Sequence, residues 1–198
     1  MKRAAIAVRM HSGWGAFVAV SVTAGKVHLL DRRRMVVVPA GTPGAIQPYH
    51  FAKPLELPEA QAFLAKSLAA AEKPARTAIQ NVVGELSARQ YRVVGAAVLL
   101  ASGRPLPVLS KILAAHPLIH AAEGEFFRGA FRNACEALGI SIIGVRERDL
   151  AERFESALGK TATRMWQEVS DLGRTVGPPW TQDQKLATLA ALLVLAQK

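Results

Sequence analysis

Hydrophobic residues alternate with other residues along the first third of the chain, which is the pattern of β-strands. In "WGAFVAVSVTAG", residues 14–25, Ala16, Val18, Val20 and Val22 share one face and Phe17, Ala19, Ser21 and Thr23 share the other. Residues 4–10 and 26–38 have a similar extended character, and Gly25 can adopt the positive φ of a tight turn. The sequence therefore predicts three antiparallel strands.

Further along the chain, short apolar runs alternate with helical segments. "VVGAAVLLA", residues 93–101, and "ISIIGV", residues 140–145, are typical of buried strands. Helices are expected over about 59–86 and 106–138 and again from about 149, with a break at Pro117 that would leave His116 as a helix cap. The order β-β-β-α-β-α-β-α predicts an α/β fold in a single domain, residues 1–198, whose mixed sheet carries helices on both faces.

Two segments differ from the rest of the chain. Residues 39–58 contain five prolines, so we expect a loop without regular structure that either covers a site or simply connects elements at the surface. Residues 181–198 begin with "TQDQ", a capping box, and continue as a helix that is apolar nearly all round. We expect this helix to be buried against the sheet, with a homodimer contact as the alternative.

The composition of the chain indicates its cellular compartment and the kind of partner that it binds. The single cysteine, Cys135, excludes an intrachain disulfide and favours the cytoplasm. Arg9 interrupts the first apolar stretch too early for a signal peptide, and the last apolar run is shorter than the roughly twenty residues of a membrane span. We expect no membrane association, and the net charge of +10 favours nucleic acid or a small anionic ligand as partner.

Two stretches carry a resemblance to a known family. "IAVRMHSGWGAFVAVSV", residues 6–22, is similar to the first hairpin of Holliday-junction resolvases, and "DQKLATLAALLVLA", residues 183–196, is similar to their last helix, whose first turn carries an aspartate. Together with the element order, they make the chain resemble the ribonuclease H-like superfamily in its resolvase-like branch. The resemblance implies a nuclease site in which several carboxylates bind two Mg²⁺ ions.

Most of those carboxylates are absent from this sequence. Arg9 stands where the resemblance places the first-strand aspartate, and residues 101–102 are not acidic. Asp183 matches the aspartate of the last helix, and Glu147 is a second possible residual carboxylate. Mg²⁺ is expected only if Glu123, Glu147 and Asp183 converge, and the site is otherwise degenerate.

The stretch "HPLIHAAEGEFFRGAF", residues 116–131, contains the second candidate chemistry. Glu123 falls on the apolar stripe of this helix, so its carboxylate must find a partner. One interpretation pairs Glu123 with an arginine from the sheet, and the other makes His120 and Glu123 a catalytic acid–base pair. Gly124 leaves room for a ligand or another segment of backbone.

Basic residues follow the strands whose carboxyl ends are expected to share one edge of the sheet. Arg9 and His11 lie at the end of the first strand, Arg104 lies after the fourth strand and Arg146 after the fifth. Ligands collect at this edge in sheets with helical crossovers. We therefore predict an anion-binding group made of these four residues.

No metal site is predicted. His116 and His120 have the four-residue spacing that can place two imidazoles on one helix face. Pro117 is expected to leave His116 ahead of the helix, however, and the sequence contains no His-Glu-x-x-His pattern.

These observations favour a binding or regulatory module on a degenerate ribonuclease H-like fold, with nucleic acid as a candidate partner. One alternative is a hydrolase or transferase that acts on a phosphate or carboxylate substrate through His120 and Glu123. Another is a homo-oligomeric interaction protein that associates through the last helix.

Overall fold

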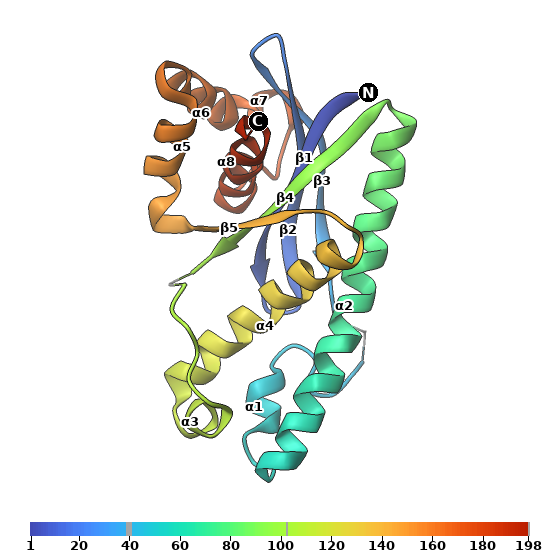
Figure 1. The fold of residues 1–198 in the computed structure, drawn as a ribbon, viewed down its shortest axis with the longest axis vertical. Helices are drawn as coiled ribbons and strands as arrows, with labels where there is room; N and C mark the ends of the chain where they lie inside the picture. The colour runs from blue at the N-terminus through green and yellow to red at the C-terminus, as the bar shows by residue number, and fades with distance from the viewer. Residues whose placement is uncertain (39–40, 102, 198) are drawn as a thin grey trace.

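A computed structural model describes residues 1–38, 41–101 and 103–197 of the chain (Figure 1). The strands are β1 (Lys2–His11), β2 (Trp14–Thr23), β3 (Lys26–Val36), β4 (Tyr91–Leu100) and β5 (Ile142–Arg146). The helices are α1 (Pro48–Ala52), α2 (Leu57–Ala88), α3 (Leu109–Ala114), α4 (His116–Ala137), α5 (Leu150–Leu158), α6 (Ala162–Asp171), α7 (Gly173–Val176) and α8 (Gln182–Ala196), with 3₁₀ turns η1 (Glu147–Asp149) and η2 (Gly159–Thr161).

The five strands form one mixed sheet in the order β3-β2-β1-β4-β5. β1 pairs antiparallel with β2, and β2 with β3, whereas β1 pairs parallel with β4 and β4 with β5. The turn between β2 and β3 has Ala24 and Gly25 at positive φ, as a tight hairpin requires. The predicted α/β class, the mixed sheet and the order of strands and helices along the chain are confirmed.

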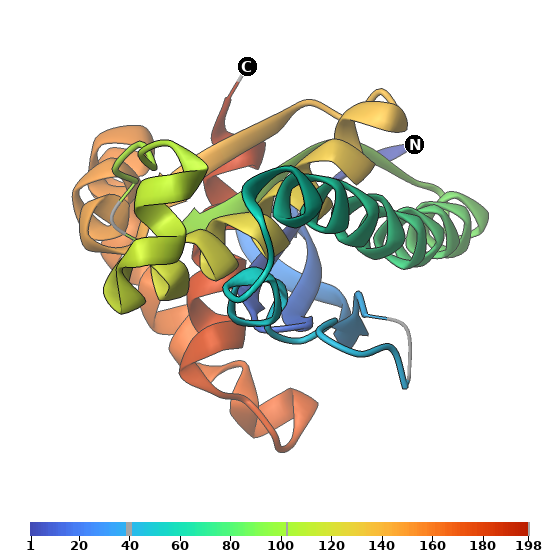
Figure 2. The same ribbon diagram turned by 90° about the horizontal axis from the view of Figure 1, so that it is seen from below.

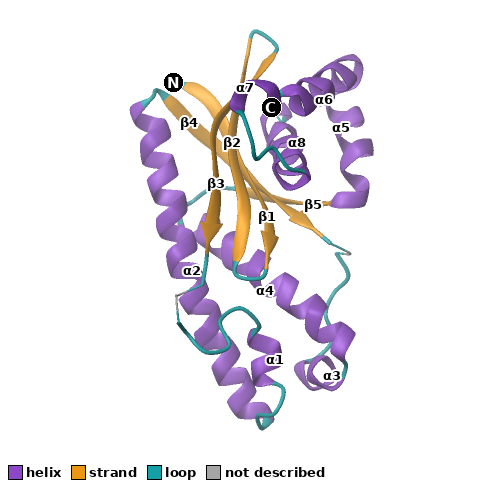
Figure 3. Ribbon diagram, turned by 180° about the vertical axis from the view of Figure 1, so that it is seen from behind, coloured by secondary structure: helices purple, strands orange, loops and turns teal. Residues whose placement is uncertain are grey.

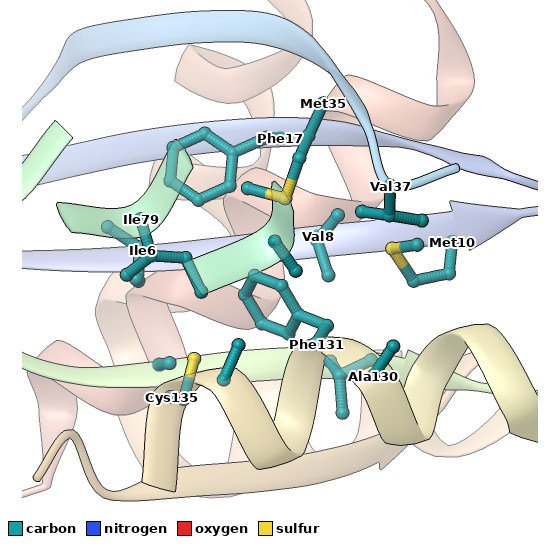
Figure 4. Close-up of a cluster of buried hydrophobic side chains, with 14 of the residues drawn as sticks. Ile6, Val8, Met10, Phe17, Met35, Val37, Ile79, Ala130, Phe131 and Cys135 are labelled. Carbon is teal, nitrogen blue, oxygen red and sulfur yellow. The ribbon is translucent and has the colours of Figure 1, made fainter. Parts of the chain in front are cut away.

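Helices cover both faces of the sheet, as the sequence predicts. On one face, Phe127, Phe131 and Cys135 of α4 and Ile79 of α2 pack on Ile6 and its neighbours (Figure 4). On the other face, the side chains of α5, α6 and α8 pack on the alternate residues of β1 and β2. Figure 2 shows α2 and α8 on different sides of the strands. The alternating side chains of β2 therefore pack into two hydrophobic cores, one on each face of the sheet, rather than into one core and solvent.

The last helix is an internal element of this domain. Thr181 and Gln184 form the predicted capping box, with the Thr181 backbone N–H donating to Gln184 Oε1 at 2.7 Å. Leu189, Leu192 and Leu193 are at most 4% exposed and pack in the core beside β1, β2 and β4. Burial against the sheet is confirmed, and the apolar side chains that suggested a homodimer contact are already covered.

The proline-rich stretch is partly helical, contrary to expectation. Pro48 occupies the first turn of α1, where its missing N–H costs no hydrogen bond, and α2 begins at Leu57 with Pro58 in the same role. Residues 39–40, at the start of the stretch, lie outside the described residues. Two of the five prolines thus lie at the start of a helix instead of excluding one.

None of the helices in the described part of the chain combines the length and apolarity needed to cross a membrane.

Candidate functional site

The carboxyl ends of the parallel strands β1, β4 and β5 lie at one edge of the sheet, toward the end where α1 and α3 lie (Figure 3). Arg9 and His11 come from β1, Glu147 comes from the η1 turn after β5, and Asp183 comes from the first turn of α8. The structure brings these four residues together. They form what we call the Arg9 cluster.

The Arg9 guanidinium bridges two carboxylates. Its Nε and Nη2 donate to the two oxygens of Glu147 at 2.8 and 3.2 Å, and its Nη1 donates to Asp183 Oδ1 at 2.7 Å. The hydrogen bond to Glu147 and the charges of both carboxylates raise the pKa of Arg9, against the opposing effect of burial. The two predicted residual carboxylates therefore converge, but on a protein cation.

Two Mg²⁺ ions do not fit this cluster. Such a site needs several carboxylates with oxygens free to coordinate. Glu147 and Asp183 both direct carboxylate oxygens at Arg9, and Glu123 instead accepts hydrogen bonds from His50. The residues of this chain do not supply the ligand set that the resemblance implies.

His11 extends the cluster toward an aromatic side chain. His11 Nε2 lies 2.9 Å from Asp183 Oδ2, and its ring stacks on Trp14 with 4.3 Å between centroids and 14° between planes. The guanidinium of Arg34 lies 3.8 Å from the Trp14 ring, within cation–π distance. A protein cation, an indole and an imidazole are therefore in contact beside the Arg9 cluster.

A cleft of about 390 Å³ borders this stack, and we call it the Trp14 cleft. It is lined by Trp14, Ala16, Arg32, Arg33, Arg34, Pro179, Thr181, Asp183 and Gln184. Arg32 donates to backbone carbonyls of residues 176–179, and Arg33 pairs with Asp31 and Glu85. Arg34 is exposed and has Trp14 beside it, so its charge faces solvent at the cleft.

The other two predicted anion-binding arginines lie near the same edge but have different neighbours. Arg146 pairs with Asp149, the residue at the N-terminus of α5. Arg104 lines a separate cavity of about 380 Å³ together with Glu125 and Arg132. Residue 102 lies outside the described residues. The predicted four-residue anion group is therefore divided, with Arg9 and His11 in one cluster and Arg104 and Arg146 outside it.

Glu123 is buried, as its position on the apolar stripe predicts, but its partner is a histidine. The residue is 3% exposed, and its Oε1 accepts hydrogen bonds from the backbone N–H of His50 at 3.2 Å and from His50 Nδ1 at 2.9 Å. In the described part of the chain, His50 takes the place of the arginine from the sheet that one interpretation expected as the partner. Burial and the charge of Glu123 raise the pKa of the neighbouring Tyr49 hydroxyl.

His120 lies on the same helix but is not the hydrogen-bond partner of Glu123. Its ring contacts those of His50 and His116 at centroid distances of 4.9 and 4.4 Å. The acid–base role of His120 and Glu123 stays a prediction, and the observed carboxylate–imidazole pair involves His50. The hydrogen bonds of Glu123 and those of Arg9 form separate networks in the described part of the chain.

Gly124 permits a close approach, as expected, and the approaching group is internal. A Cβ at Gly124 would lie 2.7 Å from Nη2 of Arg128, one turn along the same helix. Arg128 is 8% exposed and pairs with Glu125 at 2.9 Å. The space above Gly124 is therefore filled by a guanidinium of the same helix.

Sequence reasoning missed Trp14 and Arg34 as site residues, and it considered His50 only as part of a loop that could cover a site. His50 lies in the proline-rich stretch, 73 residues from Glu123, and no periodic pattern links them. Trp14 and Arg34 belong to paired strands, with Trp14 opposite Val36. Their proximity depends on the hairpin register, which shifts by one residue between Ala19 and Val20, so the tight turn at Gly25 alone does not predict it.

No protein-family model matches the sequence, and no curated protein matches it significantly. Among solved structures, Thermus thermophilus RuvC in complex with Holliday junction substrate matches with a TM-score of 0.52 and 14% identity over 98% of this chain and 92% of that one. A second Thermus thermophilus RuvC structure matches with a TM-score of 0.52 and 12% identity over the same shares. An exopolyphosphatase from Cytophaga hutchinsonii matches with a TM-score of 0.37 and 12% identity over 76% of this chain and 36% of that one.

The sheet topology and the likeness to RuvC define the class of this domain as a ribonuclease H-like α/β fold. The likeness to RuvC extends over nearly the whole length of the chain. At these identities the likeness concerns the fold alone.

Proposed function

We propose that this protein is a nucleic-acid-binding module on a ribonuclease H-like fold that has lost two-metal nuclease chemistry. The observation that carries the proposal is the bridging of Glu147 and Asp183 by Arg9 beside the Trp14 cleft. A guanidinium supplies no Lewis acidity and activates no water. The same edge of the sheet nevertheless presents an exposed cation, Arg34, whose guanidinium lies over the half-buried ring of Trp14.

Arginine and tryptophan side by side suit a nucleic-acid strand. An arginine charge attracts phosphate, and a base can stack on a guanidinium plane such as that of Arg34, which Trp14 supports from below. The net charge of +10 adds a long-range attraction for a polyanion. The structural neighbour RuvC was solved with a Holliday junction substrate, so a four-way DNA junction is the first ligand to test.

The test measures binding of a labelled four-way junction, a duplex and a single strand of related sequence by fluorescence anisotropy. We expect association with at least one of them that weakens linearly in log affinity against log salt. Trp14→Ala should lower affinity by about 1–3 kcal/mol, roughly 5- to 160-fold, because it removes the ring on which the Arg34 guanidinium lies. Arg34→Ala should reduce the salt slope by about one.

Arg76→Ala is the matched control, because Arg76 is an exposed arginine on α2 rather than at the cleft. It should leave affinity unchanged apart from the small loss of overall charge. Absence of salt-dependent binding to every nucleic acid would overturn the proposal. Equal losses of affinity for Arg34→Ala and Arg76→Ala would show that the Trp14 cleft is not the binding site. Cleavage of the nucleic acid in Mg²⁺ or Mn²⁺ would contradict the proposed loss of nuclease chemistry.

A further inference from the structure

Three histidines from two separate parts of the chain meet at one point. His50 lies on α1, and His116 and His120 lie on α4. Their ring centroids are 5.3, 4.9 and 4.4 Å apart. We propose that His50, His116 and His120 bind one divalent transition-metal ion, with Zn²⁺ as the probe, and that Glu123 orients His50 for this role. This inference does not rest on the proposed function.

The start of α4 places two histidines on one helix face, which the sequence did not predict. The helix begins at His116 rather than at Pro117, so His116 and His120 are one turn apart on the same helix face. Pro117 is accommodated because the first turn of a helix leaves its backbone N–H groups without intrahelical partners. The four-residue spacing therefore does place two imidazoles together.

His50 completes the set from a different element. One nitrogen from each of the three rings lies within 4.8 Å of the other two. Ligand nitrogens on a tetrahedral zinc, each about 2.0–2.1 Å from the metal, are about 3.3 Å apart. The rings therefore need a closure of at most about 1.5 Å, which side-chain rotation can supply.

Glu123 gives His50 the outer hydrogen bond that metal-binding histidines usually have. Its buried Oε1 lies 2.9 Å from His50 Nδ1. A carboxylate in this position favours the tautomer with hydrogen on Nδ1, which leaves the Nε2 lone pair for a metal. The same oxygen accepts the His50 backbone N–H, so the carboxylate fixes the segment as well as the ring.

The donor set selects the class of ion. Three imidazoles suit Zn²⁺ and its first-row neighbours, whereas Mg²⁺ and Ca²⁺ prefer oxygen ligands. His116 and His120 are exposed, so water can reach a fourth coordination position. Bound metal would fasten α1 to α4 and thereby hold the proline-rich segment against the helix that carries Glu123.

The experiment measures Zn²⁺ binding to the full chain by isothermal titration calorimetry, with Co²⁺ absorption as a report on coordination. We expect one Zn²⁺ per chain and the visible spectrum of four-coordinate Co²⁺. His50→Ala is the decisive variant, because His116 and His120 alone form an ordinary helical pair. It should lower Zn²⁺ affinity by roughly 100-fold, and Glu123→Gln by about 10-fold, as loss of an outer hydrogen-bond partner does.

His28→Ala is the matched control, because His28 is an exposed histidine on β3 outside this group. It should leave stoichiometry and affinity unchanged. Thermal unfolding of each variant without metal verifies that it is folded. If His50→Ala fails to fold, His50→Gln, which keeps a polar side chain of similar length, replaces it and should cost a similar affinity.

Three results would overturn the proposal. The first is no Zn²⁺ binding by the wild-type chain. The second is binding that His50→Ala leaves unchanged, which would assign the metal to the helical pair alone. The third is equal loss in His28→Ala, which would make the binding nonspecific.

Discussion

Nη1 of Arg9 lies 2.7 Å from Oδ1 of Asp183, and this contact joins the central strand to the last helix across 174 residues of chain. The same guanidinium binds Glu147, so one side chain ties together β1, the turn after β5 and α8. A positive charge thus occupies the space between two carboxylates, where the resemblance to resolvases implies a third carboxylate and metal ions.

Replacing Arg9 with an acid should create a metal requirement. Arg9→Asp places three carboxylates together, and without divalent ions their repulsion should lower the free energy of unfolding by about 2 kcal/mol, roughly 4–8 °C in Tm. Mg²⁺ binds such a group and should restore part of the loss. Thermal unfolding with and without Mg²⁺ measures both effects.

Arg9→Met is the control for that experiment. It removes the guanidinium without adding a carboxylate, so Mg²⁺ should restore less stability than in Arg9→Asp. Mg²⁺ should also leave the Tm of the wild-type protein nearly unchanged. An equal shift in all three proteins would show that the ion binds elsewhere.

Removing the Glu123 carboxylate should loosen the segment that carries His50. Glu123→Ala leaves the His50 backbone N–H and Nδ1 without their acceptor, at a cost of about 1–3 kcal/mol. Proteolysis and amide exchange should increase mainly over residues 41–56, while β1 and β4 keep their protection. Uniformly faster exchange throughout the sheet would contradict this local role.

The single thiol should be unreactive in the folded protein. Cys135 is 0% exposed in the core beneath the sheet (Figure 4), and burial, followed by the charge of Glu136, raises its pKa from 9.0 to about 12. A thiol reagent at pH 8 should modify it only after unfolding in denaturant. Rapid modification of the native protein would contradict the packing of α4.

The same raised pKa makes Cys135 a source of alkaline sensitivity. The folded state holds the thiol proton more tightly than the unfolded state, so this contribution to stability is present below pH 9 and is lost between pH 9 and about pH 12. Cys135→Ala removes the titrating group. The stability difference between wild type and variant, measured by denaturant unfolding, should therefore change in favour of the variant as pH rises.

The last helix should contribute to the stability of a single chain. Leu192→Ala removes a side chain that is 1% exposed, and it should cost about 2–5 kcal/mol through lost burial and a residual cavity. Leu57→Ala, at a position 40% exposed, is the control and should cost little. Molar mass in solution should be the same for both variants and the wild type, whereas a lower mass for Leu192→Ala alone would restore the dimer interpretation.

The sequence by itself determined the class and order of the fold. Alternation along β2, continuous apolar runs in β4 and β5, and the capping box at Thr181 are local signals, because each follows from backbone geometry over a few residues. They place the carboxyl ends of the parallel strands at one edge and thereby indicate Arg9 and His11 as neighbours, whereas Asp183 was indicated by the resemblance alone. The inward direction of Glu123 also follows from helical periodicity alone.

Only the tertiary structure decided which partners these side chains meet. The proline-rich stretch has no periodicity that fixes its path, so the contact between His50 and Glu123 depends on how α1 packs against α4. Whether α4 begins at His116 or at Pro117 is a difference of one residue, and sequence signals do not locate a helix boundary with that accuracy. Charge pairing between distant segments, such as Arg9 with Asp183, requires both ends to be placed to within a few ångströms, and only the packed sheet and helices do that.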